Sequence, residues 1–181
     1  FDPGIAWATS TEASLEHWQK KGGLIDKNQP NPGGINDFRD PYLWKQDNRW
    51  HMIIGAAIGS GGALEHYTTT NLAAGNWTRA SQPFTSLPFS SMDIGSAIWE
   101  MPVFEYIGEH NGQDKYILVV SPIGGAMRKT EAPYVRSVYW TGTWNAAAAN
   151  GAGQFIPDYA QPKNLDVIHG HLSPTVTRAA N

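Results

Sequence analysis

Short stretches in which hydrophobic and polar residues alternate recur along the chain, separated by turns rich in glycine, proline and asparagine. One such stretch covers residues 5–9, and a similar stretch at 64–68 repeats it at an offset of 59 residues. Alternation with a period of two is typical of β-strands. Because no stretch keeps the period of an α-helix for long, we expect an all-β fold.

A second repeated pattern is a polar residue or methionine followed by proline and a short hydrophobic run. It occurs at 40–44, 101–104 and 173–176. Proline is tolerated at the first position of a strand, where its missing N–H lies outside the hydrogen-bonded ladder, so each copy predicts the start of a strand. The predicted turn and following strand cover 46–48 and 50–56 after the first copy, and 108–114 and 116–120 after the second.

Each unit is therefore predicted to contain four antiparallel strands, and units of this kind repeated around an axis form a β-propeller. The units are longer than the roughly 40–45 residues of the shortest propeller repeats, and long loops at 75–97 and 146–165 account for the excess. A β-sandwich is the alternative, but it does not explain the repeat. We expect residues 1–181 to form a partial propeller without a second domain: the end of one blade, two full blades and the start of the next. On this interpretation the remainder of the same polypeptide is needed to close the ring.

Composition narrows the possible partners. The net charge is −3 and only 16% of the residues are charged, which excludes nucleic acid and anionic membranes as expected partners. Eight tryptophans and seven tyrosines provide flat surfaces on which sugar rings can lie. The chain has no cysteine, so it has neither a disulfide framework nor a thiolate metal site.

Two carboxylates occupy corresponding places in consecutive units. Asp40 lies one residue before its proline, and Glu100 lies two residues before the next. Because the first strand of each propeller blade lines the central channel, we expect the two side chains to converge. Arg39 beside Asp40 would keep that carboxylate ionised, whereas Trp99 and Met101 around Glu100 would raise its pKa and suit a proton donor. A pair of converging carboxylates is what glycoside hydrolysis uses.

At these residues the chain resembles glycoside hydrolase family 32. Phe38–Pro41 resembles the arginine-aspartate-proline motif of that family, and Trp99–Pro102 resembles its acid/base motif, usually tryptophan-glutamate-cysteine-proline. The resemblance implies a five-bladed propeller that hydrolyses or transfers β-fructosyl units with retention and needs no cofactor. It implies that Glu100 is the general acid/base and that Asp40 holds sugar hydroxyls and stabilises the transition state. Arg39, Trp99 and His171 are predicted to contact the substrate.

Two departures from the family pattern affect the expected specificity. The asparagine-aspartate-proline motif of the nucleophile is absent, and Asp2 is no substitute, because it precedes a third-strand pattern. Met101 replaces the usual cysteine, and residues 170–172 replace an aspartate-phenylalanine-tyrosine segment of invertase-like members. These changes favour levan- or inulin-acting relatives. Asp93, in the loop before Glu100, is expected to be solvated.

The function expected from the sequence is a retaining hydrolase acting on a β-fructan or a fructo-oligosaccharide. A fructosyltransferase using the same site, an inverting arabinose- or xylose-cleaving propeller enzyme, and a non-catalytic carbohydrate-binding propeller are the alternatives. We expect the protein to be extracellular, with the cytoplasm left open.

Overall fold

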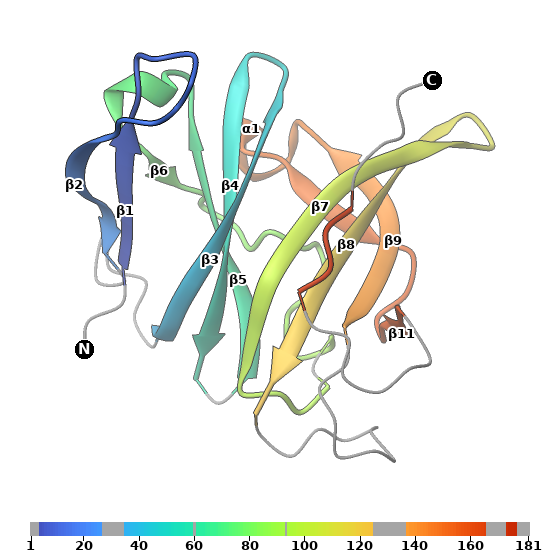
Figure 1. Cartoon of the computed structure of the whole chain (residues 1–181). Coiled ribbons are helices and arrows are strands. Elements are labelled where there is room, and N and C mark those ends of the chain that lie inside the picture. The colour runs from blue at the N-terminus through green and yellow to red at the C-terminus, as the bar shows by residue number, and fades with distance from the viewer. Residues whose placement is uncertain are drawn as a thin grey trace.

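The described part of the chain consists almost entirely of β-strands (Figure 1). The computed structural model describes residues 4–26, 35–59, 61–92, 94–124, 137–165 and 173–176. Within these ranges the helices are the 3-10 helix η1 (Leu72–Ala74) and the four-residue α1 (Ala148–Gly151). None of the described helices has the length and apolar character that would let it cross a membrane.

The strands form three antiparallel sheets that follow one another along the chain, from left to right in Figure 1. The first sheet pairs β1 (Gly4–Thr9) with β2 (Gln19–Asp26). The second contains β3 (Ile35–Gln46), β4 (Arg49–Ile58), β5 (Gly61–Thr69) and β6 (Thr78–Arg79), in that order. The third contains β7 (Ile98–His110), β8 (Gln113–Ile123), β9 (Val138–Asn145) and β10 (Gln154–Pro157), and β11 (Lys163–Asn164) also pairs with β9.

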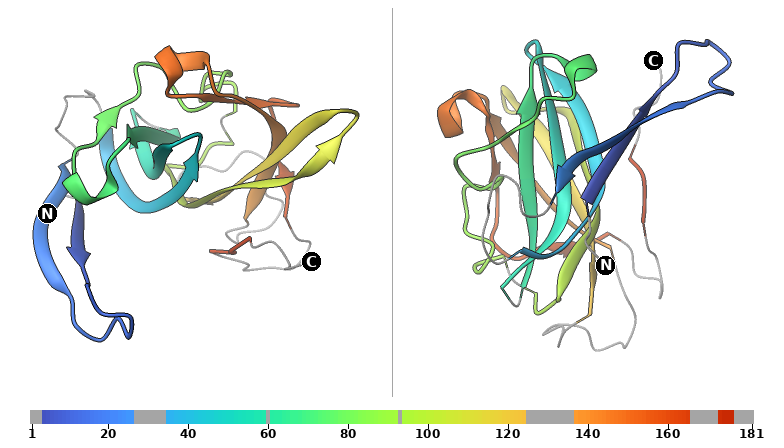
Figure 2. Two further views of the ribbon diagram at one scale, coloured as in Figure 1. Left: turned by 90° about the horizontal axis from the view of Figure 1, so that it is seen from above. Right: turned by 90° about the vertical axis from the view of Figure 1, so that its left-hand side faces the viewer.

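The two larger sheets have the architecture of neighbouring propeller blades. In both, the four main strands are neighbours in space in the order of the sequence, which is an up-and-down antiparallel arrangement. β7, the first strand of the second blade, contacts both β3 and β4 of the first blade. Figure 2 shows the two sheets standing side by side, each twisted along its length. The predicted all-β propeller architecture is therefore confirmed.

The repeat at an offset of 59 residues corresponds to a repeated pair of strands. β1 and β5 lie at matching places in the two copies, and each is followed by a polar connection and a tryptophan before the next strand. The two tryptophans differ in burial: Trp18 is exposed, whereas Trp77 packs against buried residues of the first blade. The β1–β2 hairpin is therefore the local counterpart of β5 and β6.

The proposed strand starts at proline are wrong. β3 begins at Ile35 and β7 at Ile98, so Pro41 and Pro102 lie inside their strands. At both prolines the pairing register with the next strand shifts, between Arg39 and Pro41 and between Glu100 and Val103. A bulge accommodates an interior proline because its residues are released from the regular ladder, so no N–H is missing where one is needed.

Two predicted loops are shorter than expected. The turn expected at 108–114 contains only Asn111 and Gly112, because β7 continues through a further bulge near Gly108. The loop expected at 146–165 contains α1, β10 and β11. These short strands pair with β9 and lack the alternation by which a strand is recognised in a sequence.

The main hydrophobic core lies between the two blades. It joins Ile53 and Leu64 of the first blade to Trp99, Phe104 and further residues of the second. A smaller cluster, which includes Ile5, lies between the β1–β2 hairpin and the first blade. Burial of each large apolar side chain stabilises the fold by about 1.5–3 kcal/mol relative to exposure, so contacts between blades are a main source of stability.

A pair of buried histidines lies inside the first blade. His51 and His66 are each 3% exposed, and Nδ1 of His51 lies 3.2 Å from Nε2 of His66. The Trp44 ring stacks on His51 with 4.8 Å between ring centroids. Burial first, and then the positive charge of Arg49, lowers the pKa of His51 to about 4. Burial, together with His51 and Arg49, lowers the pKa of His66 to about 3.

The free energy of unfolding is expected to fall as the pH drops below 6.5. The two pKa values are lower in the folded chain than in the unfolded chain, so acid protonates the unfolded chain first. The stabilisation is present above pH 6.5 and is lost as the pH falls towards about 4 for His51 and about 3 for His66. His51 alone accounts for a loss of roughly 2 kcal/mol between pH 7 and pH 5, which urea unfolding at the two pH values measures.

A matched pair of variants tests the origin of this effect. His51→Phe keeps an aromatic ring against Trp44 and is expected to reduce the difference between the two pH values. His110→Gln replaces an exposed histidine outside the pair and is expected to leave the difference unchanged. Equal unfolding free energies at pH 7 and pH 5 in the unmodified protein would contradict the prediction.

Candidate active site

The two candidate carboxylates lie at equivalent bulges in the first strands of consecutive blades. Asp40 has a φ of 58° and Met101, next to Glu100, a φ of 48°. Each directly precedes a proline, and each coincides with a register shift in its strand. Left-handed backbone is uncommon for residues other than glycine, and the following proline already restricts its neighbour to extended conformations. This repeated conformation changes the direction in which the side chains at the bulge point.

The third copy of the motif has the same local backbone. Ser173 precedes Pro174 and has a φ of 58°. Its N–H donates to Oγ of Ser121 in β8 at 3.0 Å, much as the N–H of Met101 donates to a side chain of the preceding blade. Backbone strain that recurs at three matching positions belongs to the motif itself and is held by contacts between blades.

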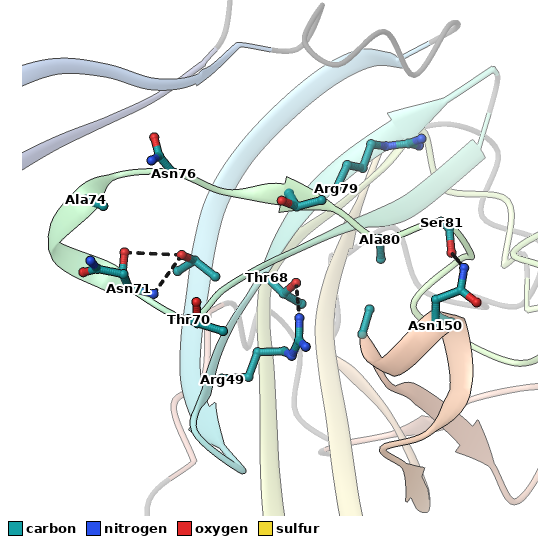
Figure 3. Close-up of a pocket in the computed structure, with 14 residues that line it drawn as sticks. Arg49, Thr68, Thr70, Asn71, Ala74, Asn76, Arg79, Ala80, Ser81 and Asn150 are labelled. Atoms are coloured by element: carbon teal, nitrogen blue, oxygen red, sulfur yellow. Dashed lines mark hydrogen bonds between the residues drawn. The ribbon is translucent and has the colours of Figure 1, made fainter.

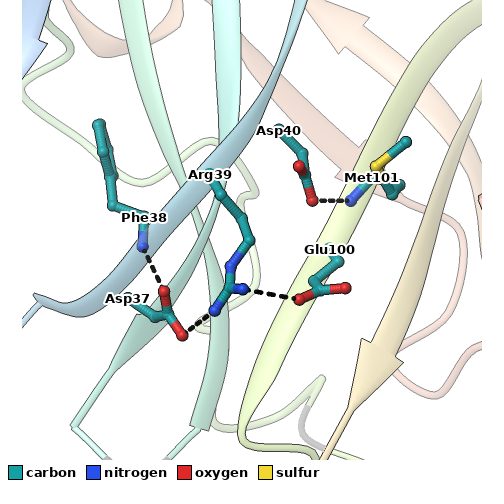
Figure 4. Close-up of polar contacts among 6 residues, drawn as sticks. All are labelled: Asp37, Phe38, Arg39, Asp40, Glu100 and Met101. Atoms are coloured by element: carbon teal, nitrogen blue, oxygen red, sulfur yellow. Dashed lines mark hydrogen bonds and ion pairs between the residues drawn. The ribbon is translucent and has the colours of Figure 1, made fainter. Parts of the chain in front are cut away.

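A hydrogen bond and an ion pair bring Asp40 and Glu100 together across the interface between the blades (Figure 4). The Asp40 carboxylate accepts a hydrogen bond of 3.1 Å from the N–H of Met101. Nη1 of Arg39 lies 3.3 Å from Oε1 of Glu100. The two carboxylates are therefore neighbours in space, as the propeller argument predicts, although they are 60 positions apart in the chain.

A glycine makes this close approach possible. Gly55 of β4 pairs with Arg39, and a Cβ atom built on it would lie 2.3 Å from the backbone oxygen of Trp99 and 3.4 Å from Cα of Glu100. The backbone of the second blade thus rests directly on Gly55. Any larger residue would push the Glu100 backbone away from the first blade.

The environment of Glu100 favours its protonated form. Its side chain is only 16% exposed. Burial raises the pKa of the Glu100 carboxyl above its usual range, the Arg39 guanidinium opposes this shift, and the negative charges of Asp40 and Asp37 add to it. A carboxyl group with a raised pKa suits general acid catalysis.

The partners of Arg39 differ from those expected. Its guanidinium pairs with Asp37 and Glu100 rather than with the adjacent Asp40. Asp37 was not among the predicted site residues. Asp37 lies two positions before Arg39, and residues i and i+2 of a strand point to the same face. That spacing is the signal by which the sequence could have identified Asp37 as a partner of Arg39.

The predicted substrate contact of Trp99 is wrong for this structure. The Trp99 ring is fully buried, and it packs against Trp140 and Phe89 with centroid distances of 5.2 and 5.5 Å. It also covers Gly62, where a Cβ atom would lie 2.1 Å from the ring. A side chain without exposed surface cannot contact a sugar, so Trp99 anchors the strand that carries Glu100.

Several residues considered in the sequence lie outside the described residues: Asp2, Asp93 and His171, with the segment 170–172. The role of His171 stays a prediction. In the described ranges, no three histidine, cysteine, aspartate or glutamate side chains come together as a metal site requires.

The pH dependence of activity is expected to shift in opposite directions in two neighbouring variants. Asp37→Asn removes a negative charge that raises the pKa of Glu100, so the alkaline limb of the pH–rate profile should move to lower pH. Arg39→Gln removes the positive charge that lowers this pKa, so the limb should move to higher pH. Profiles of kcat/KM for both variants measure the shifts, and movement of both in the same direction would contradict this electrostatic account.

The sequence matches the Glycosyl hydrolases family 32 N-terminal domain over residues 5–172. The chain belongs to glycoside hydrolase family 32. The motifs around Asp40 and Glu100 therefore lie in a family 32 domain, as the resemblance implied.

Relatives of this family 32 chain include sucrose-6-phosphate hydrolases from bacteria. The chain is 30% identical to that of Escherichia coli over 110 residues, covering 60% of this chain and 20% of that protein. It is 26% identical over 148 residues to that of Zymomonas mobilis, covering 78% of this chain and 26% of that protein. The chain thus spans about a fifth to a quarter of the length of these relatives.

Solved structures of family 32 share the fold. A β-fructofuranosidase of Bombyx mori superimposes with a TM-score of 0.62 at 19% identity, over 91% of this chain and 31% of that chain. The fructan 1-exohydrolase IIa of Cichorium intybus, in a structure with 1-kestose, gives a TM-score of 0.57 at 21% identity, over 87% of this chain and 30% of that chain. At these identities the likeness supports the propeller fold alone.

Proposed function

We propose that the protein containing this chain is a retaining glycoside hydrolase that cleaves β-fructosidic bonds. The observation that carries the proposal is the placement of Glu100: a half-buried carboxyl with a raised pKa, adjacent to Asp40 and held by Arg39. Membership of family 32 and the bulge geometry of both motifs support it.

In the proposed reaction, Glu100 first acts as an acid. A third carboxylate, from polypeptide outside these 181 residues, attacks the anomeric carbon of the fructosyl unit while its bond to the leaving oxygen breaks. The Glu100 proton moves to that oxygen. Glu100 then takes a proton from water, whose oxygen attacks the same carbon and releases the third carboxylate.

Asp40 is proposed to stabilise charge on the sugar ring. Its Oδ2 accepts the hydrogen bond from the N–H of Met101, so the carboxylate has a fixed orientation. An ionised carboxylate next to the ring holds sugar hydroxyls and favours the positively charged oxocarbenium-like transition state. Arg39 holds the Glu100 carboxylate and, being 44% exposed at its side chain, retains surface for substrate.

We further propose levan or inulin as the substrate. Met101, 38% exposed next to Glu100, replaces the cysteine usual in the family motif, and this departure favours fructan-acting relatives. The comparison proteins are named for sucrose 6-phosphate and for fructosides, so both classes belong in the substrate test. Extracellular location stays a prediction.

The stereochemistry of cleavage tests the mechanism. The protein should release fructose or fructan oligomers from levan or inulin faster than it cleaves sucrose or sucrose 6-phosphate. NMR spectra recorded in the first minutes should show the β-anomer as the first product. Initial release of the α-anomer, or cleavage of arabinan or xylan instead, would favour an inverting enzyme. Sugar binding without any cleavage would favour a carbohydrate-binding propeller.

A further inference from the structure

A polar cavity lies between the blades, away from the candidate carboxylates (Figure 3). Its volume is about 550 Å³. The first blade contributes the end of β5 and the segment through β6, and the turn at α1 contributes Asn150 from the second blade. Arg49, on its wall, lies six residues along β4 from Gly55, which is about 20 Å in a strand. The cavity is therefore separate from the site around Glu100.

Among the described residues, the charged side chains on the wall of this cavity are both arginines, and no aspartate or glutamate lines it. Arg79 is already neutralised, because its Nε and Nη2 donate to the buried Glu65 carboxylate at 2.5 and 2.9 Å. Arg49 donates from Nη1 to Oγ1 of Thr68 at 3.3 Å and forms no ion pair within the described residues. One positive charge on the wall is thus left without a counter-charge from the described part of the chain.

Amide and hydroxyl side chains line the same cavity. Asn71, Asn76 and Asn150 line the cavity and are exposed, together with Thr70 and Thr78. Nδ2 of Asn150 makes a hydrogen bond of 3.3 Å to Ser81, which leaves its second N–H available. Guanidinium and amide N–H groups around a solvent-filled space match an anion with several oxygen acceptors.

We propose that this cavity binds the phosphate group of a small molecule, with Arg49 as the main ligand. A phosphate presents several strong acceptors to the guanidinium fork and the three asparagine amides. The cavity is larger than inorganic phosphate requires, so it leaves room for an attached sugar. No aromatic ring from the described ranges lines it, which argues against a neutral oligosaccharide as the occupant.

Titration of the protein that contains this chain, with inorganic phosphate and separately with glucose 6-phosphate, tests the proposal. Calorimetry at 0.15 M NaCl gives the affinity, and NMR of the asparagine side-chain amides locates the site. We expect saturable binding with shifts at Asn71, Asn76 and Asn150. Tighter binding of glucose 6-phosphate would assign the site to phosphorylated sugars, and equal affinities would assign it to the phosphate group alone. Absence of saturable binding of both probes would overturn the proposal.

Phosphate binding by four variants distinguishes this cavity from other positively charged positions. Arg49→Gln is expected to weaken binding ten-fold or more. Lys45→Gln removes the same charge from an exposed side chain of the first blade outside the cavity and should leave the affinity unchanged. Asn150→Asp places a negative charge at an exposed position of the wall and should abolish binding even where Arg49→Gln fails to fold. Loss of binding in Arg39→Gln, with retention in Arg49→Gln, would place the anion beside Glu100 and overturn the proposal.

Discussion

Replacing Glu100 by glutamine is expected to lower kcat/KM for a β-fructan by about 10²–10⁴-fold while substrate binding is retained. Glutamine keeps the shape and leaves an amide oxygen beside Arg39, but it cannot donate a proton to the leaving oxygen. The alkaline limb of the pH–rate profile, which reports the raised pKa of Glu100, should disappear with it. Steady-state kinetics and a binding measurement with intact substrate check both points.

Two comparisons make this result specific. Glu109→Gln removes the same charge from an exposed position of the same strand and should leave the activity unchanged. A fructoside whose leaving group is a stable anion requires no protonation, so Glu100→Gln should slow its first step far less. Full activity of Glu100→Gln on fructan would exclude it as the acid. An equal loss with both kinds of leaving group would assign Glu100 a role in binding only.

Replacing Gly55 by alanine is expected to destabilise the fold by about 2–3 kcal/mol and to displace Glu100. The added methyl group would lie 2.3 Å from the backbone oxygen of Trp99 and 3.2 Å from that of Arg39. Backbone atoms of paired strands cannot move aside as a flexible side chain would. The second blade must therefore shift, which also lengthens the contact between Arg39 and Glu100. Denaturant unfolding and kcat/KM should both record the change.

Gly61→Ala is the matched control for this prediction. It lies on the neighbouring strand of the same blade, and a Cβ atom there meets nothing within 4 Å. We expect a change in the free energy of unfolding within about 0.5 kcal/mol and no change in activity. If Gly55→Ala were as stable and active as Gly61→Ala, the close approach at Gly55 would not control the position of the second blade.

The strands predicted best from the sequence are those with a regular environment. In β1, β4 and β5, hydrophobic and polar residues alternate or the whole run is strongly hydrophobic. Both patterns are typical of strands, so these three were predicted. β10 and β11 were missed because two to four residues are too few to show a period. The prolines misled the prediction of β3 and β7, because a bulge, which depends on the neighbouring strand, allows proline inside a ladder.

The site could be predicted in part. The proximity of Asp40 and Glu100 followed from their matching places in repeated units, which needs only the periodicity of a propeller. The pKa direction of Glu100 followed from its apolar neighbours. The partners of Arg39 and the burial of Trp99 could not be predicted, since both depend on which face of each strand meets the next blade.

The sequence by itself determined the repeated blade architecture and the family, and it predicted the two candidate carboxylates, because strand alternation and short motifs are local properties of the chain. The tertiary structure alone decided that Arg39 links Asp37 to Glu100, that Trp99 supports rather than contacts a ligand, and that Gly55 receives the next blade. Arg49 likewise lines one cavity with Asn150 only because the α1 turn of the second blade lies near the segment that follows β5. Each of these features rests on an interface between blades. Distances across such an interface depend on packing between residues far apart in the chain, which no local pattern specifies.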